Sequence, residues 1–207
     1  MSRDLEVRTY SLVLRLELSL FRETGEFEKG YELAKQISDA LQSREKSLSK
    51  EQELMVFFYM AFFFWSSNDR KKTLHYLNRI FESKEREDIL CFARILNIIS
   101  HFEMGNTLIL GHIIRSTKSF LQRRKKLFQS ELLVLKYIDK MAGMNSDAEK
   151  RECFIALGKA MDETLKDPYE RTVLDYMDLS SWITSHVENI PFAEVVRKKN
   201  GGKKKKD

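Results

Sequence analysis

The sequence predicts an all-helical protein, and three observations carry this prediction. Only two of the 207 residues are proline and eight are glycine, so few positions break a helix. The alternating β-branched runs and Asn-Gly turns that mark strands are missing. Apolar residues instead recur at helical spacing between capping motifs. We therefore expect about nine helices, joined by short links and stacked as antiparallel hairpins, up to about residue 190.

The first two helices are expected over residues 4–24 and 27–42. Gly25 separates them, because glycine adopts the left-handed conformation after a helix without a Cβ penalty. Leucines recur every four residues along the first helix and mark a wide apolar face. This face comprises Leu12, Leu16 and Leu20, flanked by Leu5, Val13 and Leu18. Since the end helices of a helical array need polar outer faces, we expect a preceding segment or another chain to cover it.

The third helix, expected over residues 50–66, is apolar on all sides in its last three turns. It opens with a capping box, in which the Ser49 hydroxyl accepts from the amide of Gln52 and the Gln52 side chain reaches back. Its apolar turns contain Phe57, Phe58, Tyr59, Met60, Phe62, Phe63, Phe64 and Trp65. A helix that is apolar all round has to be covered on all sides, so we expect this one at the centre of the fold.

Six further helices follow the same logic of apolar periodicity between caps. We expect them over residues 70–82, 86–104, 107–125, 127–142, 146–166 and 168–189. Ser146 and Glu149 form a second capping box at the start of the eighth helix. The ninth is expected to open with Asp167 as N-cap, Pro168 at N1 and Glu170 at N3.

The charge is concentrated at the end of the chain. The formal charge is +5, but seven lysines and arginines against Asp207 give residues 197–207 a charge of +6, which leaves −1 for residues 1–196. The high isoelectric point therefore does not identify the body as a nucleic-acid-binding domain. We predict a single helical domain over residues 1–190 and a basic, disordered tail over residues 191–207.

Cysteine use and hydropathy indicate a reducing compartment. Cys91 and Cys153 each lie in an apolar helical pattern, which favours buried thiols over a disulfide. The N-terminal residues have no apolar core of a signal peptide. The longest apolar run, residues 54–65, has twelve residues, whereas a membrane span needs about 20. We expect a soluble, cytoplasmic protein with no transmembrane segment.

The sequence lacks the motifs of the common enzyme classes. It has no HExxH, no pair of histidines at metal-ligand spacing, no CxxC, no phosphate-binding loop and no GxSxG or GxGxxG. The four histidines are His75, His101, His112 and His186. We predict a protein that is not an enzyme, with no catalytic residues, no metal ligands and no cofactor.

Three turn segments point to a repeat, at residues 25–37, 68–80 and 105–117, offset by 43 and 37 residues. They resemble the tetratricopeptide repeat, whose signature has an aromatic residue late in the first helix, a glycine-containing turn and a small residue where the second helix crosses. The matching residues are Phe57, Ala61, Phe64 and Thr73 in one copy, Phe21, Gly25, Phe27 and Gly30 in another, and Gly105 in the third. The resemblance covers roughly residues 8–120, and neither offset is the family's spacing of about 34 residues. It implies a right-handed α-solenoid that binds peptides or partner proteins along a concave face.

The first functional hypothesis is a non-enzymatic scaffold for a protein or peptide partner. Arg94, Asn97 and His101 follow the spacing i, i+3, i+7 and share one helix face. If the first helix of each pair lines the concave surface, these residues form the partner groove, with Arg94 as a bidentate donor. The alternative interpretation is an ordinary polar face.

A second hypothesis is binding to RNA or to an anionic surface. Residues 111–126 contain basic side chains and no acid, and Arg115, Lys118, Arg123 and Arg124 form the predicted anion-binding ridge. No base-stacking aromatic is interleaved, since Phe120 and Phe128 have core spacing. Lys203 to Lys206 could tether the chain to an anionic surface. The alternative is a solvated basic surface and tail.

A third hypothesis is a ligand-sensing regulatory domain of a larger protein. The uncovered apolar face of the first helix agrees with a larger parent chain and equally with a homo-oligomer.

Overall fold

The computed structural model describes residues 3–43, 49–123 and 128–203. Over these residues it contains eleven α-helices and one short 3-10 helix, and no strand, so the all-helical prediction is confirmed. The chain divides into two compact units, which we describe separately. Unit 1 comprises residues 1–93 and 196–207, and unit 2 comprises residues 94–195. The expectation of a single domain over residues 1–190 stays a prediction.

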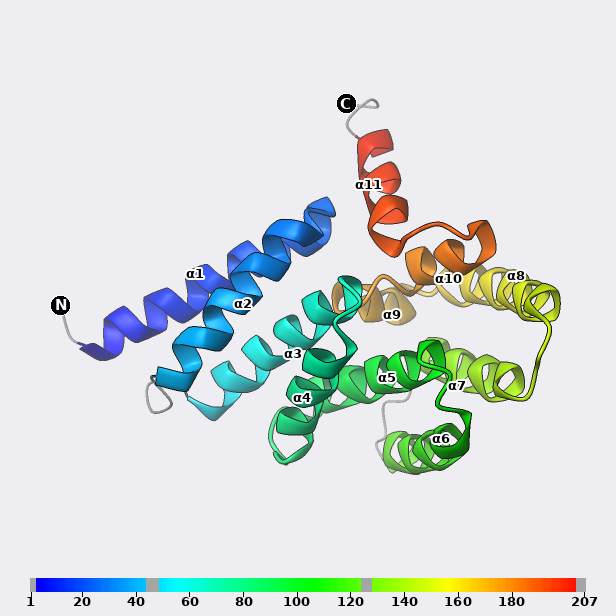
Figure 1. Ribbon diagram of the computed structural model, residues 1–207, viewed down its shortest axis with the longest axis horizontal. Coiled ribbons are helices and arrows are strands. Elements are labelled where there is room, and N and C mark those ends of the chain that lie inside the picture. Colours follow the sequence, from blue (N-terminus) through cyan, green and yellow to red (C-terminus); the bar gives the residue numbers. More distant parts are fainter. Residues whose placement is uncertain (1–2, 44–48, 124–127, 204–207) are drawn as a thin grey trace. The chain divides into compact units, whose positions relative to one another are not determined.

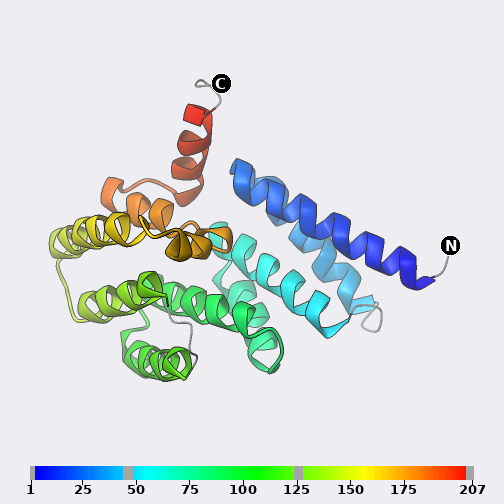
Figure 2. The ribbon, with the colours of Figure 1, turned by 180° about the vertical axis from the view of Figure 1, so that it is seen from behind.

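Unit 1 is built from two helix hairpins (Figures 1 and 2). The helices are α1 (Arg3–Thr24), α2 (Phe27–Ser43), α3 (Lys50–Ser66) and α4 (Arg70–Phe81), followed by the first half of α5 (Glu87–Glu103). Helix α3 packs against α1, α2 and α4, and is therefore the central helix of this unit. The sequence predicts this helix at the centre of the whole fold, and the structure shows it at the centre of unit 1.

The composition of α3 explains its central place. Eleven of its residues are buried, and they lie on all sides of the helix. The predicted capping box at Ser49 and Gln52 is present and fixes its start. Rings from both neighbouring helices meet it: Tyr31 of α2 lies edge-on to Phe64 at 5.5 Å, and Tyr76 of α4 stacks on Phe64 at 5.6 Å. The aromatic residues of α3 thus hold both hairpins together.

The two hairpins approach each other closely at Gly30 of α2. A Cβ atom at this position would lie 2.1 Å from the ring of Phe63, which is fully buried. Only glycine lets the two helices pack at this distance. The resemblance to tetratricopeptide repeats and the solenoid arrangement stay predictions.

Helix α1 covers α2 and α3 with only one side. Leu14 and Leu18 are buried, whereas Leu12, Leu16 and Leu20 are 52%, 61% and 55% exposed. Leu12, Leu16 and Leu20 of the predicted leucine face therefore lie on the outer side of α1, because α2 and α3 occupy the other side. Leu18, which the periodicity assigned to the flank of this face, is instead buried. The expectation that something else must cover this face stays open.

Unit 2 contains the second half of α5 and the helices that follow it to α10. These are α6 (Thr107–Gln122), α7 (Gln129–Ala142), α8 (Asp147–Thr164), α9 (Pro168–Arg171), the 3-10 helix η1 (Thr172–Asp175) and α10 (Leu179–Glu188). Helix α7 packs against α6 and α8, and α8 packs against α10. The first eight predicted helices agree with the observed ones to within three residues at each end.

The predicted ninth helix, over residues 168–189, is wrong. The structure divides it into α9, η1 and α10. Asp167 caps the first piece as expected, accepting from the amide of Tyr169 at 2.8 Å. Asp178 then starts α10, because its carboxylate accepts from both the amide (3.0 Å) and the hydroxyl (2.7 Å) of Ser181. This local N-cap competes with a continuous helix.

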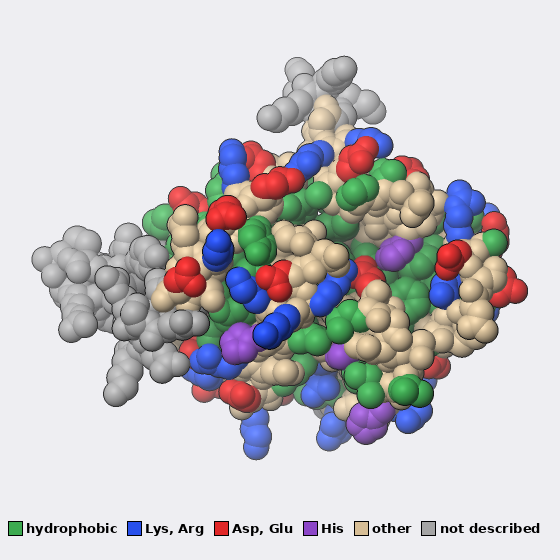
Figure 3. Space-filling view, in the orientation of Figure 1, with side chains coloured by type: hydrophobic (Ala, Val, Ile, Leu, Met, Phe, Trp, Pro, Cys, Tyr) green, Lys and Arg blue, Asp and Glu red, His purple; other side chains and the backbone are tan. Residues whose placement is uncertain are grey.

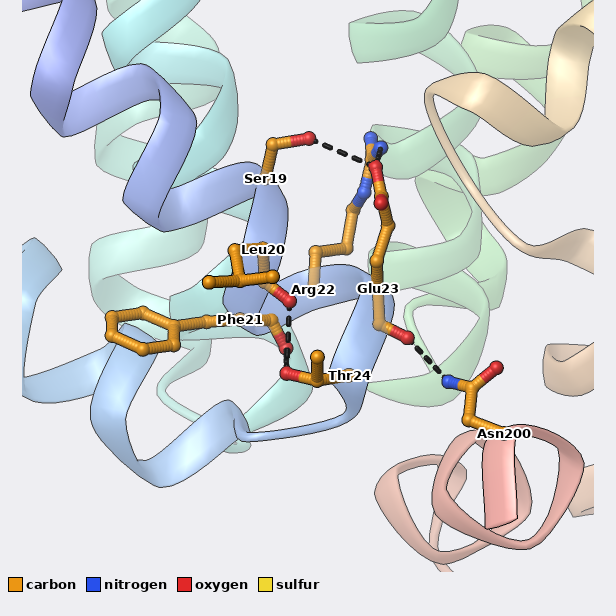
Figure 4. Close-up of polar contacts among 7 residues, drawn as sticks. All are labelled: Ser19, Leu20, Phe21, Arg22, Glu23, Thr24 and Asn200. Atoms are coloured by element: carbon orange, nitrogen blue, oxygen red, sulfur yellow. Dashed lines mark hydrogen bonds and ion pairs between the residues drawn. The ribbon is translucent and has the colours of Figure 1, made fainter. Parts of the chain in front are cut away.

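Residues beyond 190 differ from the disordered tail that the sequence predicts. They form α11 (Phe192–Lys203), whereas residues 204–207 lie outside the described residues. The Arg197 guanidinium donates to the carbonyl oxygen of Gly25 at 2.8 Å and forms an ion pair with Glu28. Figure 4 shows the side chain of Asn200 bonded to the backbone carbonyl of Glu23. These contacts attach α11 to the turn between α1 and α2.

The ion pair with Arg197 also affects the acidity of Glu28. The hydrogen bond from the guanidinium lowers the pKa of this carboxyl below its ordinary value. Gly25 makes the close contact possible, since its φ of 76° is left-handed and an added Cβ would lie 2.8 Å from the Arg197 side chain.

Candidate interaction surfaces

The predicted groove residues lie on the half of α5 that belongs to unit 2. Arg94, Asn97 and His101 are all half-buried and share one face of the helix, as their spacing predicts. The residues around them on α5 are largely buried, including Ile95, Ile98 and Ser100. The face is therefore a narrow polar strip rather than a broad exposed surface.

Arg94 contacts the helix that follows α5 in the chain. Its guanidinium lies 4.3 Å from the centre of the Phe120 ring of α6. Such a cation–π contact is worth about 0.5–2 kcal/mol, depending on how far the cation is desolvated. Arg94 thus contributes to the packing of α5 on α6, in addition to any role toward a partner.

His101 belongs to the turn between α5 and α6. Its Nδ1 atom accepts a hydrogen bond from the side-chain amide of Asn106 at 3.1 Å. Burial lowers the pKa of His101 below its ordinary value, which favours the neutral ring that accepts this bond. The predicted groove function of Arg94, Asn97 and His101 stays a prediction, and two of these residues also hold α5 to α6.

The predicted basic ridge lies on α6. Arg115, Lys118 and Arg123 are exposed, whereas Arg124 lies outside the described residues. The opposite face of α6 is buried and consists of Leu110, Ile114, Thr117 and Leu121. Phe120 is half-buried under Arg94, in agreement with its core spacing. The structure therefore places the three described basic residues on the solvent side of one helix.

Exposed apolar side chains lie beside this ridge, and the sequence interpretation missed them. Leu108 is 98% exposed and Ile109 is 47% exposed in the first turn of α6, and Met104 is 37% exposed at the end of α5. Figure 3 shows hydrophobic, basic and histidine side chains side by side over α6 at the lower edge of the view. Leu108 and Arg115 are seven residues apart, and this spacing could have indicated that they share one face of α6.

A polar and aromatic cluster joins α5, α8 and α10. The Trp182 indole donates to Oε1 of Glu103 at 2.9 Å, and Nε2 of His186 lies 3.4 Å from the same oxygen. His186 stacks on Phe154, with the ring centres 4.2 Å apart. Trp182 and Phe154 are buried, so the cluster holds three helices together.

The buried carboxylate of Glu170 caps the start of α7. Glu170 is 5% exposed and accepts from the amides of Gln129 (2.8 Å) and Ser130 (3.0 Å) and from the Ser130 hydroxyl (2.9 Å). The sequence pattern placed Glu170 at the first turn of its own helix, but its side chain caps another helix. The unsatisfied amides and the positive end of the helix dipole favour a carboxylate at this point.

No group of three or more His, Cys, Asp or Glu side chains among the described residues is placed to hold a metal ion. Cys91 and Cys153 are both buried, as predicted. None of the helices in the described ranges is long and apolar enough to cross a membrane. Comparison with family models, with curated proteins and with solved structures finds no match.

Proposed function

We propose that the chain is a non-enzymatic helical scaffold that binds a protein partner through the outer face of α1. The observation that supports this most directly is the row of exposed apolar side chains on that helix. The row consists of Leu12, Val13, Leu16 and Leu20, which are between 44% and 61% exposed. Contiguous exposed apolar surface on a folded protein typically marks an interaction site.

The spacing of this row indicates the shape of the partner. Leu12, Leu16 and Leu20 follow the i, i+4, i+8 pattern, which forms a ridge along a helix. Such a ridge fits into the groove between side chains of another helix, so the proposed partner presents an amphipathic helix. The buried side of α1, with Leu14 and Leu18, meanwhile holds the ridge in place on α2 and α3.

A separate candidate surface is the polar strip on α5, which belongs to unit 2. Arg94, Asn97 and His101 carry groups suited to binding a carboxylate or a peptide backbone. A pulldown with the double variant Arg94→Ala, His101→Ala tests this role. Unchanged recovery of the partner by a folded double variant would exclude the strip from the interface.

The main test replaces the ridge by polar residues. The triple variant Leu12→Ser, Leu16→Ser, Leu20→Ser should lose the partner in affinity capture, while its helical content and thermal midpoint stay close to those of the wild type. The matched control is Leu108→Ser, which removes a leucine that is 98% exposed on α6. A photo-reactive residue at position 16 should crosslink the partner helix, and one at the exposed Lys84 should not.

Sedimentation of the purified protein shows whether the partner is a second copy of this chain or a different protein. Self-association that the triple variant abolishes would identify the partner as a second copy. Equal recovery of all partners by the wild type and the triple variant would refute the proposal. A small molecule bound in native mass spectra would instead favour the ligand-sensing domain.

A further inference from the structure

The exposed face of α6 combines apolar and basic side chains in a defined order. Leu108, His112, Arg115 and Ser119 follow the spacing i, i+4, i+7, i+11, and all four are exposed. Residues at this spacing lie along one line on a helix surface. The line is therefore apolar at the N-terminal end of α6 and basic further along.

Further side chains widen both ends of this line. Ile109 and Met104 lie beside Leu108 at the turn between α5 and α6, and both are exposed. Lys118 and Arg123 flank Arg115 and are also exposed. We call this set the α6 outer face.

The charged side chains of the α6 outer face are all basic. The sequence contains no Asp or Glu between Glu103 and Glu131. The guanidinium of Arg123 donates to the carbonyl of Ser119 at 3.2 Å, which holds this charge against the end of its own helix. The face thus presents fixed positive charge next to exposed apolar groups.

We propose that the α6 outer face binds the surface of an anionic lipid bilayer. Leu108 and Ile109 enter the boundary between headgroups and acyl chains, while Arg115, Lys118 and Arg123 contact lipid phosphates. An interfacial helix combines these two features, because apolar insertion and attraction to anionic headgroups add. This surface is separate from the α1 ridge, so the inference goes beyond the proposed function.

The same observations favour a bilayer over RNA. A site for single-stranded RNA uses aromatic platforms for the bases, and the aromatic ring of α6, Phe120, lies under the Arg94 guanidinium. A leucine that is 98% exposed contributes nothing to a phosphate backbone contact but has a clear role in an acyl layer.

Vesicle flotation of the full chain tests the proposal. The wild type should float with vesicles of phosphatidylcholine and phosphatidylserine at about 0.1 M salt, and not with vesicles of phosphatidylcholine alone. Leu108→Ser should lower the partition coefficient about tenfold or more. The double variant Arg115→Glu, Lys118→Glu should lower it by at least about 25-fold, since each lost charge is worth roughly fivefold.

The control for charge is Lys140→Glu with Lys159→Glu, two exposed lysines on α7 and α8. This pair has the same net charge as the α6 double variant and keeps the C-terminal lysines, so it should still float. If it loses binding as strongly as the α6 pair, the binding depends on net charge or on the tail and the proposal is refuted. The neutral pair Arg115→Gln, Lys118→Gln replaces the α6 variant if the latter fails to fold.

Fluorescence at position 108 tests the insertion itself. The variant Leu108→Cys can be labelled selectively, because the two native thiols are each only 6% exposed. An environment-sensitive fluorophore there should shift to the blue on anionic vesicles, and the same fluorophore in Lys159→Cys, at an exposed position on α8, should not. The absence of a fluorescence shift at position 108 would overturn the proposal. It would also be overturned if the wild type does not bind vesicles but binds generic RNA, and the Leu108→Ser variant binds that RNA equally well.

Discussion

Helices α1 and α3 are both rich in apolar residues, yet they are buried to very different degrees. In α3 eleven residues are buried, and Phe62, Phe63 and Phe64 in succession are at most 1% exposed. In α1 the leucines alternate between a buried side, with Leu14 and Leu18, and an outer side that is more than half exposed at Leu12, Leu16 and Leu20.

The difference follows from the number of neighbours. Helix α3 packs against α1, α2 and α4, whereas α1 packs against α2 and α3. Apolar residues on a helix with neighbours on all sides are buried, while the same residues on the outer side of α1 stay exposed. Hydrophobicity alone therefore does not separate buried from exposed apolar residues, whereas the number of neighbouring helices does.

The largest expected effect comes from the central helix. Phe64→Ala should lower the free energy of unfolding by roughly 3–5 kcal/mol, because it removes a fully buried ring and leaves a cavity. Urea unfolding followed by circular dichroism measures this change. A loss below about 1 kcal/mol would mean that the helix tolerates a void and is not the centre of unit 1.

A smaller effect is expected where α2 crosses α3. Gly30→Ala places a methyl group 2.1 Å from Phe63, and this overpacking outweighs the gain in helix propensity. We expect a net loss of about 1–2 kcal/mol in the same unfolding assay. The control is Gly143→Ala after α7, where an added Cβ meets no atom within 4 Å. Equal effects of the two changes would contradict the close approach at Gly30.

A pH effect is expected at the turn between α5 and α6. The pKa of His101 is lowered by burial, so the unfolded chain, with the ordinary value of 6.5, takes up the proton first as the pH falls. The stabilising contribution of neutral His101 is complete above pH 6.5 and declines as the pH drops toward the lowered folded pKa. Thermal midpoints of the wild type should fall more steeply below this pH than those of His101→Gln, and parallel curves would refute the assignment.

The smallest expected effect is on the outer side of α1. Leu16→Ser should change the stability by no more than about 0.5 kcal/mol, since the side chain is already 61% exposed. A loss as large as that of Phe64→Ala would show that the outer side of α1 is covered within the chain, and the comparison between the two helices would fail.

Local sequence patterns predicted most of the helices because their ends are fixed by nearby residues. Ser49 with Gln52 and Asp167 with Tyr169 form their caps within a few residues of the chain. The break in the ninth helix was missed, because Asp178 had to be recognised as an N-cap inside an apolar pattern that continues on both sides. The helix over residues 192–203 was missed because it follows Pro191 and its second half is rich in lysine and glycine, while its docking depends on Arg197 and the distant Gly25.

The candidate surfaces were predictable only in part. The spacing placed Arg115 and Lys118 on one exposed side of α6, and the structure agrees. It gave no indication that Arg94 contacts Phe120, because this contact depends on how α5 and α6 cross. The spacing also gave no sign that Leu108 is exposed, since a single leucine at the start of a helix can be either buried or exposed.

The sequence by itself determined the helical class, the apolar character of α3 and the caps at Ser49 and Asp167, because these depend on composition and on residues close in the chain. The tertiary structure alone decided which side of α1 faces solvent, which helix the Glu170 carboxylate caps and how far Leu108 projects. Burial depends on neighbours that lie far away in the chain, and a local pattern contains no information about them.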